Sequence, residues 1–301
     1  MKPLLPRYPV YVPSKGRSET CFTADFLVRD GVPFRLVVEP QEAERYKAKY
    51  GADRVLVLPW DNPGSVIPAR NWIKEHATKE GHKRYWQLDD NIRTLLRWYR
   101  GKRIPCNAGI ALRVAEDFTD RFTNVAIAGL EYSMFAFPYS EKGVPAFIRN
   151  TRVYSCSLVL NEIPYKWRGR YNEDTDICLQ ALSGGWCTLL IAAFLIVKIP
   201  TMTVKGGNTS TLYKGEGRLR MSRALERLWP GVVQTKRRFK RPQHYVSDQW
   251  RSFTTPLKLR PGLDLKKLPK VNEYGMQLVE QKPVKAKHLK KIAATFNSKA
   301  R

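Results

Sequence analysis

The chain of 301 residues is 43% hydrophobic and contains 8 Trp, 14 Tyr and 12 Phe, a composition that excludes an intrinsically disordered protein and is typical of a globular one. Its 53 Lys and Arg residues against 27 Asp and Glu residues give a formal net charge of +26, which favours a polyanionic partner, nucleic acid ahead of a membrane surface; a surface that is merely basic is the alternative. The excess lies mainly in residues 198–301, with 25 basic and 6 acidic residues.

The cysteines and apolar segments indicate in which cellular compartment the protein is found. The five cysteines form no CxxC pair, which argues against a disulfide framework and a zinc ribbon. Prolines interrupt the N-terminal segment, which has no apolar signal core, and the longest apolar run, residues 187–197, is too short to span a bilayer. We therefore expect a cytoplasmic protein with no membrane partner.

Strand-forming and helix-forming stretches alternate along the first part of the chain. In chain order, the sequence predicts a strand at residues 8–12, a helix at 17–30, a strand at 34–38, a helix at 42–50, a strand at 55–58, a helix at 69–79 and a strand at 85–88. This order predicts an α/β fold, Rossmann-like, with a mostly parallel central sheet flanked by helices. In such sheets, ligands bind at the carboxyl ends of the strands.

Polar loops follow the first and fourth of these strands. The first loop offers backbone donors, a hydroxyl group and positive charge from Pro13, Ser14, Lys15 and Arg17. The loop after the fourth strand offers hard oxygen ligands from Asp89 and Asp90. A nucleotide diphosphate bridged by Mg²⁺ or Mn²⁺ satisfies both loops, whereas a solvated turn is the alternative for the two aspartates. Neither a P-loop nor a dinucleotide-binding motif is present.

A second acidic cluster lies in the sequence YNEDTDICLQAL, residues 171–182. We expect Asn172 to cap a helix whose apolar residues face the core, so that the first turn carries Glu173, Asp174 and Asp176. The helix macrodipole alone favours acidic residues at this position. The cluster therefore has either a structural or a chemical role.

Glycine, serine and threonine are frequent in residues 205–218. Such a flexible backbone is suited to closing over a diphosphate, with Lys205, Gly206 and Gly207 as its contacts. A plain surface loop fits the same composition, because turns use the same residue types.

Basic residues of the last third are the expected DNA contacts, because lysine and arginine bind phosphates without regard to base sequence. We assign this role to Arg218, Arg220, Lys236, Arg237, Arg238, Lys240 and Arg241.

We divide the chain into a domain at residues 1–255 and a basic C-terminal extension at 256–301. The domain comprises two halves, at about 1–105 and at about 106–255. The extension forms either a short strand pair and a basic helix that bind DNA, or a solvated tail.

The motifs YVPSKGR, IPARNWIKEHA, QLDDN and RYNEDTDICLQAL resemble those of nucleotide-sugar glycosyltransferases of the GT-A type. Together with AGLEYSMF, RNTRVYSCSLVLNEIPY and TMTVKGGNTSTLY, their order is similar to that of the TET-associated glycosyltransferases of bacteriophages. The similarity covers roughly residues 8–255. Each motif alone is weak, and the specificity lies in their order.

The resemblance implies a GT-A fold, a nucleotide-sugar donor, most simply a UDP-sugar, and a divalent metal, Mn²⁺ or Mg²⁺. It makes the half at about 1–105 the nucleotide-sugar half and the half at about 106–255 the acceptor half. Asp89 and Asp90 form the DXD-like acidic turn, and Asp89 also contacts the donor. This sequence departs from the usual pattern at Asn91, which supplies an amide oxygen in place of a carboxylate. His244 is a candidate third metal ligand or an ordinary surface histidine. Arg70 faces the donor diphosphate or pairs with a structural acid.

The resemblance also implies the acceptor, because members of this family are thought to glycosylate 5-hydroxymethyl-pyrimidines in phage DNA. Asp174 is the expected base that takes the proton from the attacking hydroxyl, with Glu173 as the alternate. We expect direct displacement onto 5-hydroxymethylcytosine, reached in the major groove or after the nucleotide rotates out. The enzyme would then act in the cytoplasm of an infected bacterium.

Two other functions fit parts of the pattern. A transferase that acts on a protein or polysaccharide needs the same donor site but not the +26 charge. A DNA-binding structural protein on a degenerate transferase fold needs the charge but not Asp89, Asp90 and Asp174 together. Metal and UDP binding distinguish the enzyme from the structural protein.

Overall fold

Apolar, β-branched and aromatic residues form the strands of the N-terminal part, and amphipathic stretches form the helices between them. The structure is a computed structural model that describes residues 4–61, 64–99, 102–136, 145–199, 217–238, 240–246 and 249–272. The first elements are β1 (Val10–Pro13), α1 (Phe22–Arg29), β2 (Arg35–Val38), α2 (Ala43–Tyr50), β3 (Val55–Val57), α3 (Ile67–Lys79) and β4 (Arg84–Leu88). The predicted alternation of strands and helices is confirmed.

The first helix begins later than the sequence predicts, because the loop before it is tied to α2 and the turn preceding α2. The amide of Gly16 donates to both carboxylate oxygens of Glu42 at 2.8 Å, and the amide of Arg17 donates to the hydroxyl of Tyr46 at 3.1 Å. Gly16 has a φ of 64°, a left-handed conformation that glycine adopts readily. These contacts hold the loop at the carboxyl end of β1.

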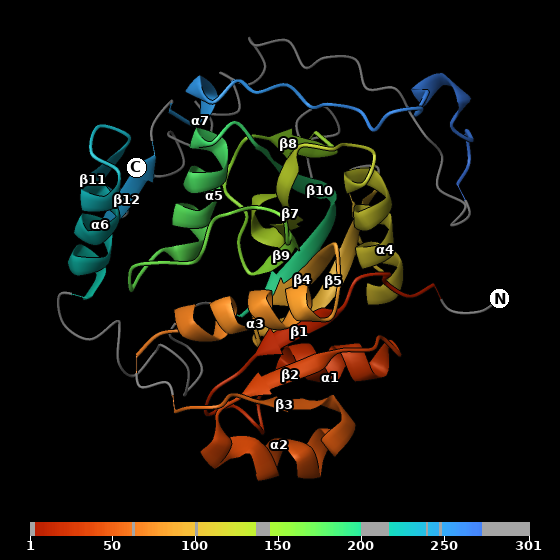
Figure 1. Cartoon of the computed structure of the whole chain (residues 1–301), viewed down its shortest axis with the longest axis vertical. Helices are drawn as coiled ribbons and strands as arrows, with labels where there is room; N and C mark the ends of the chain where they lie inside the picture. Colours follow the sequence, from red (N-terminus) through yellow and green to blue (C-terminus); the bar gives the residue numbers. More distant parts are fainter. Residues whose placement is uncertain are drawn as a thin grey trace.

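The remaining elements are β5 (Ile92–Tyr99), β6 (Lys102–Pro105), α4 (Ala108–Thr119), β7 (Val125–Tyr132), β8 (Phe147–Arg149), β9 (Cys156–Leu160), α5 (Glu173–Ser183), β10 (Cys187–Lys198), α6 (Gly217–Leu228), β11 (Val233–Arg238), β12 (Arg241–Val246) and α7 (Gln249–Ser252). The large sheet has the order β3-β2-β1-β4-β9-β7-β10-β5-β6, with β8 beside β10 (Figure 1). Within the described sheet, β9, β5 and β8 run against the direction that the other strands share. The fold is thus α/β with a mostly parallel central sheet, as predicted.

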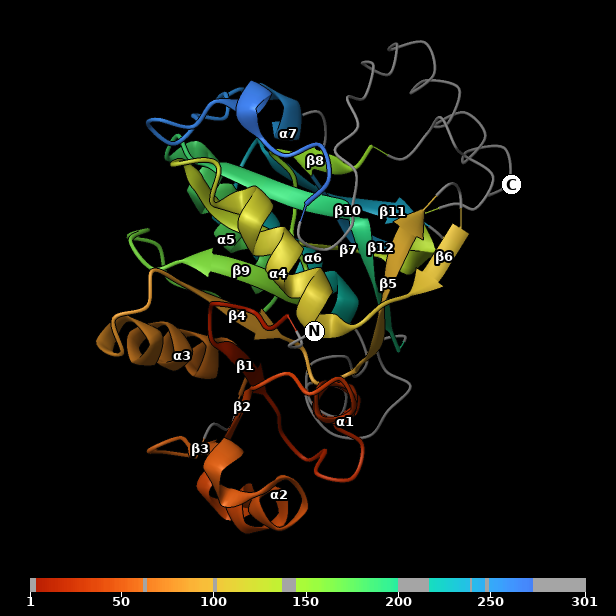
Figure 2. The same ribbon diagram turned by 90° about the vertical axis from the view of Figure 1, so that its right-hand side faces the viewer.

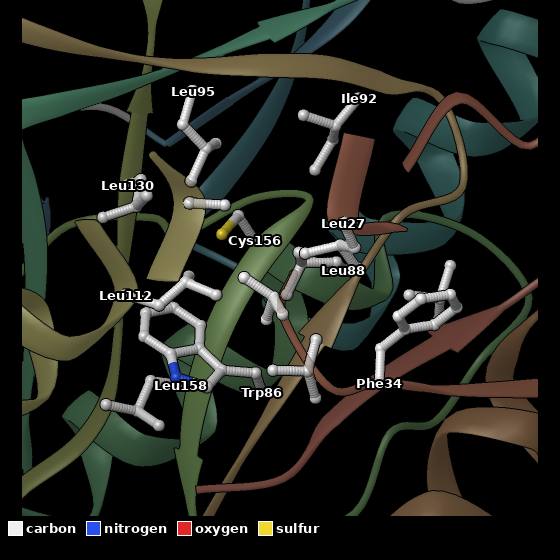
Figure 3. Packing of buried hydrophobic residues seen from close by; sticks show 14 of the residues in the cluster. Leu27, Phe34, Trp86, Leu88, Ile92, Leu95, Leu112, Leu130, Cys156 and Leu158 are labelled. Atoms are coloured by element: carbon white, nitrogen blue, oxygen red, sulfur yellow. The ribbon is translucent and has the colours of Figure 1, made fainter. Parts of the chain in front are cut away.

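Helices cover both faces of the sheet. α1, α2 and α4 contribute to one buried cluster, which includes Trp86, Leu88 and Leu158 (Figure 3), whereas α3 and α5 contribute to the other cluster, around Tyr85 and Val159. Figure 2 shows α3 and α1 on opposite sides of β1 and β4. Successive residues of β4 therefore point to opposite faces and are buried on both. Each large apolar side chain so buried stabilises the fold by about 1.5–3 kcal/mol.

Several strand ends meet at one edge of the sheet. β4 ends at Leu88, which pairs with Cys156 at the start of the antiparallel strand β9. β7 and β10 run in the same direction as β4, and they end at Tyr132 and Lys198. This edge therefore brings together residues from four separate parts of the chain.

A C-terminal unit of α6 and the β11–β12 hairpin lies beside α5 (Figure 1). Two hydrogen bonds join this unit to the start of α5. The side-chain amide of Asn172 donates to the carbonyl of Met221 at 2.9 Å, and Trp229 Nε1 donates to Asp176 Oδ1 at 2.7 Å. The hairpin is thus fixed near the acidic end of α5.

The backbone after α7 runs back over the domain. The side chain of Asn124 donates to the carbonyl of Pro256 at 2.8 Å and accepts from the amide of Lys258 at 2.8 Å. The boundary after residue 255 stays a prediction, and most of the expected structure of the extension falls on residues 273–301, outside the described residues. Within the described ranges, no helix has the length and apolar character of a membrane span.

Candidate active site

Asp89 lies immediately after β4, at the edge where the strand ends meet. Its amide donates to the carbonyl of Ser155 at 2.7 Å. Its carboxylate accepts from Ser155 Oγ at 2.7 Å, from Lys198 Nζ at 2.6 Å and from Arg70 Nη2 at 3.0 Å. Burial alone would raise the pKa of Asp89, but the positive charges of Lys198 and Arg70 hold this pKa well below its usual range. Asp89 is therefore an ionised carboxylate at neutral pH.

Arg70 on α3 joins the two acidic clusters that the sequence predicts separately. Its side chain is only 2% exposed, and its Nη1 donates to Gln87 Oε1 at 2.9 Å. Besides contacting Asp89, its guanidinium lies 3.3 Å from Asp174 Oδ1 and 3.6 Å from Glu173 Oε1. One buried cation thus holds carboxylates from β4 and α5 together.

Asp174 differs from Asp89 in its ionisation. Burial raises the pKa of Asp174 to about 7, the nearby carboxylates of Glu173 and Asp89 act in the same direction, and Arg70 opposes them. A carboxylate that titrates near neutral pH is suited to accept and release a proton. The expected position of Asp174 and Glu173 on the first turn of a helix is confirmed.

Two details of this helix differ from the sequence prediction. Asn172 stands at the N-cap position but has a φ of 54° and makes no side-chain cap hydrogen bond, because its amide reaches the carbonyl of Met221 on α6 instead. The prediction of a side-chain cap is therefore wrong. Asp176 is fully buried and pairs with Arg168 at 3.0 Å and with Trp229, so its contacts are structural.

Asp90 points away from Asp89, toward the loop after β1. It accepts from Ser14 Oγ at 2.8 Å and forms an ion pair with Arg17. Burial raises the pKa of Asp90, and Arg17 opposes that shift. The structure thus brings Ser14 and Arg17 to the carboxylate turn, as the positions of the two loops at the same sheet edge predict.

The other residues of the first loop lie close by. Pro13 ends β1, and Ser14 shares a hydrogen bond of 2.7 Å with the hydroxyl of Tyr46. Lys15 Nζ forms an ion pair with Glu39 Oε1 at 2.7 Å. Lys205, Gly206 and Gly207 lie outside the described residues.

The oxygen groups at residues 89–91 match the ligand preference of Mg²⁺ and Mn²⁺. Asn91 is buried, and its Oδ1 has no hydrogen-bond partner among the described residues, so one amide oxygen without such a partner directly follows the two carboxylates in the sequence. Among the described residues, no three His, Cys, Asp or Glu side chains gather as a metal-binding group. The three residues match a hard cation by donor type, while both carboxylates are paired with protein cations, Asp89 with Lys198 and Arg70 and Asp90 with Arg17.

His244 belongs to the C-terminal hairpin. It lies on β12, opposite Thr235 of β11. Burial, together with the charge of Arg152, lowers the pKa of His244 to about 4. Its role as a metal ligand stays a prediction.

Sequence reasoning missed Lys198, Ser155 and Tyr132. Lys198 Nζ donates to Ser155 Oγ at 2.7 Å as well as to Asp89. Because Ser155 uses its own proton for Asp89, the hydroxyl of Tyr132 donates to Ser155 Oγ, at 2.7 Å. Ser155 has a φ of 59°, an uncommon conformation for serine that functional sites often contain. The one local signal was a lysine directly after a long apolar run.

The predicted DNA contacts fall on α6 and on the β11–β12 hairpin. Arg218 and Arg220 lie on α6. The ring of Tyr245 has Lys236 Nζ at 4.3 Å and Arg238 Cζ at 4.2 Å from its centroid. The exposed cations of the hairpin are Lys236, Arg237, Arg238, Lys240 and Arg241. The structure gathers these five cations on one short hairpin.

Comparison with known proteins gives one family. The model of the TET-associated glycosyltransferases matches residues 8–207. A search of curated proteins gives no significant match. Among solved structures, the inositol-1-phosphate CTP transferase from T. maritima overlaps with a TM-score of 0.34 at 10% identity, over 64% of this chain and 88% of that chain. The family model covers most of the sheet and both carboxylate clusters, and the chain therefore belongs to the TET-associated glycosyltransferase family.

Proposed function

We propose that this glycosyltransferase moves a sugar from a UDP-sugar to the hydroxyl of 5-hydroxymethylcytosine in DNA. The observation that carries the proposal is the pair of carboxylates on Arg70, one ionised at Asp89 and one titrating near neutral pH at Asp174. Asp89 directly precedes Asp90, which contacts the β1 loop, where GT-A enzymes hold the donor. Asp174 stands on α5, beside the basic C-terminal unit.

The donor is assigned to the edge formed by the β1 loop and the β4 turn. Pro13, Ser14, Lys15 and Arg17 are the proposed nucleotide contacts, together with Arg70, Asp89 and the segment containing Lys205, Gly206 and Gly207. Asp89, Asp90 and Asn91 would hold Mn²⁺ or Mg²⁺, which when bound supplies positive charge to the departing diphosphate. His244 is the proposed additional ligand.

The proposed reaction is a direct displacement. The unprotonated carboxylate of Asp174 takes the proton of the hydroxymethyl group. At the same time the oxygen of the hydroxymethyl group forms a bond to the anomeric carbon of the sugar. The bond from that carbon to the nucleoside diphosphate breaks, and the diphosphate leaves with its electron pair. Arg70 orients Asp174 through the 3.3 Å contact, and Glu173 is the alternate base.

DNA as the acceptor is supported by charge. The excess of 53 basic over 27 acidic residues is far larger than a small-molecule acceptor requires, and the exposed hairpin presents cations suited to phosphates. We assign phosphate contacts to Arg218, Arg220, Lys236, Arg237, Arg238, Lys240 and Arg241. We further propose that residues 1–255 form the catalytic domain and that residues 256–301 are a basic extension.

A transfer assay tests this proposal. Purified protein is mixed with Mn²⁺, a panel of UDP-sugars and duplex DNA that contains 5-hydroxymethylcytosine, and the nucleosides are analysed by mass spectrometry. We expect one donor to add the mass of a sugar to hydroxymethylcytosine, and EDTA to stop the reaction until Mn²⁺ is restored. The proposal fails if no donor labels this DNA while the same donors label a protein or polysaccharide acceptor.

A further inference from the structure

An exposed aromatic group lies next to the candidate active site. Phe135 follows β7 in a short 3-10 turn, Ser133–Phe135, and its side chain is 42% exposed. Since β7 ends at the same edge as β4, this ring lies at the edge that carries Asp89. Large aromatic residues are favoured inside a protein, so an exposed one beside an active site is a candidate binding group.

Phe135 belongs to a cluster of three rings around one arginine. The guanidinium carbon of Arg152 lies 5.5 Å from the ring centroids of both Phe135 and Tyr154. The ring of Tyr132 lies 5.8 Å from that of Phe135 and 6.2 Å from that of Tyr154. Arg152 forms no ion pair with any described residue. We call Tyr132, Phe135, Arg152 and Tyr154 the aromatic clamp.

Hydrogen bonds fix the clamp to both carboxylate clusters. The hydroxyl of Tyr154 lies 3.0 Å from Thr175 Oγ1, and Thr175 directly follows Asp174. The hydroxyl of Tyr132 donates to Ser155, which in turn donates to Asp89. A planar ligand stacked on the clamp would therefore lie between the proposed base and the proposed donor site.

The two carboxylates are recessed, which limits how an acceptor reaches them. The side chain of Asp174 is 17% exposed and that of Asp89 is 22% exposed. A hydroxymethyl group in the groove of an intact duplex projects only a few bonds from its base pair. An enzyme that acts on such a group at a recessed site takes the nucleotide out of the helix.

We propose that the aromatic clamp binds the hydroxymethylated pyrimidine after it has rotated out of the duplex. Aromatic side chains and arginine planes are the groups on which unstacked bases stack. The basic hairpin lies on the same side, since Arg152 is close enough to influence His244 on β12. The hairpin then holds the phosphates while the clamp holds the base. This inference rests on the proposed function, and the tests below separate the two.

The first test compares transfer by the wild type and Phe135→Ala. We expect kcat/KM for duplex DNA containing 5-hydroxymethylcytosine to fall about tenfold, because the base then has one ring fewer to stack on, while KM for the UDP-sugar is unchanged. Phe135→Trp should restore the rate, and placing the target base in a mismatch should reduce the defect, because less stacking has to be broken. A purely structural role of Phe135 would not respond to the mismatch.

Leu259→Ala is the matched control for this variant. Leu259 is 41% exposed and is bridged to Phe122, near Asp120, which pairs with Arg84 at the opposite end of β4. This variant should transfer at the wild-type rate. Equal rates for Phe135→Ala, Leu259→Ala and the wild type would overturn the clamp proposal.

The second test needs no transfer. 2-Aminopurine is placed next to the target in hydroxymethylated DNA, where its fluorescence rises when its neighbour leaves the stack. The wild type should raise the emission and Phe135→Ala should raise it less. If the wild type labels no hydroxymethylated DNA but still raises the emission in this Phe135-dependent way, the proposed function fails and the clamp stands. If the wild type binds this DNA without a rise, base extrusion is wrong even when transfer occurs.

Discussion

Asp89 and Asp174 contact the same guanidinium but carry different charge at neutral pH. Asp89 accepts from two cations and a hydroxyl group, at 2.6–3.0 Å. Asp174 has one cation at 3.3 Å and a second acid, Glu173, as its chain neighbour. At the scale of single residues, the environment therefore keeps the Asp89 carboxylate ionised and lets the Asp174 carboxylate titrate near neutral pH.

The raised pKa of Asp174, about 7, predicts how transfer depends on pH. A general base acts only when unprotonated, so kcat/KM should rise with pH and level off above about pH 7. Steady-state rates measured with saturating UDP-sugar and varied DNA, from about pH 5 to about pH 9, show this rise of kcat/KM with pH. A rate that is independent of pH across that range, or one that falls as pH rises, would contradict the role of Asp174.

Lys198 is predicted to stabilise the fold through Asp89. Lys198→Met removes one partner of a largely buried pair, and the free energy of unfolding should fall by on the order of 2 kcal/mol, since Arg70 still contacts Asp89. Urea denaturation measures the change. Adding Asp89→Asn should recover part of the loss.

The control for this prediction is Lys166→Met. Lys166 and Glu75 lie 3.1 Å apart but are 64% and 62% exposed, so their ion pair should contribute less than about 1 kcal/mol. If Lys198→Met and Lys166→Met lowered the free energy of unfolding by similar amounts, the buried pair of Lys198 and Asp89 would contribute no more to stability than an exposed pair.

At the scale of elements, the sheet edge was only partly readable from the sequence. Local apolar runs located β1 to β4, and the polar residues after them marked the carboxyl ends. The contact between Lys198 and Asp89 spans 109 residues and depends on the pairing of β10 with β7 and of β9 with β4. No local pattern specifies such long-range pairing, so Lys198, Ser155 and Tyr132 were missed.

Close packing of β7 on β9 predicts a severe effect of Gly129→Ala. A Cβ at Gly129 would lie 2.2 Å from the carbonyl oxygen of Cys156 and 2.3 Å from Val153 Cγ1, so the two strands would have to separate. We expect the free energy of unfolding to fall by about 1–3 kcal/mol or more. Gly64→Ala is the control, because no atom of the described residues lies within 4 Å of its added Cβ. Equal urea midpoints for the two variants would show that the strands tolerate the side chain.

The β11–β12 hairpin predicts a salt-dependent effect. Replacing Arg237, Lys240 and Arg241 by Gln should weaken binding to duplex DNA of any sequence and reduce the slope of log affinity against log salt by about 1 for each phosphate that the variant no longer binds. Fluorescence anisotropy at several salt concentrations measures both. Lys79→Gln with Lys83→Gln is the control, since both lysines are exposed near the amino end of β4. An unchanged slope in the hairpin variant would remove the hairpin from the interface.

At the scale of the whole molecule, the order of motifs predicted more than single residues did. The charge of +26 favoured a polyanionic partner, and the order of motifs indicated the family that the comparison confirms. The fold places the loop after β1, the two carboxylate clusters and the aromatic clamp at one edge of the sheet, and the unit that contains the basic hairpin lies beside α5. This arrangement is what an enzyme needs to bring a nucleotide sugar and a long anionic polymer together.

The measurement that tests this account most directly is the amount of sugar transferred to hydroxymethylcytosine in duplex DNA by the wild type and by Asp174→Asn. The account predicts a labelled nucleoside from the wild type and a loss of about 100-fold to 10,000-fold in the variant, with UDP and DNA binding retained. Labelling by Asp174→Asn at the wild-type rate would contradict it.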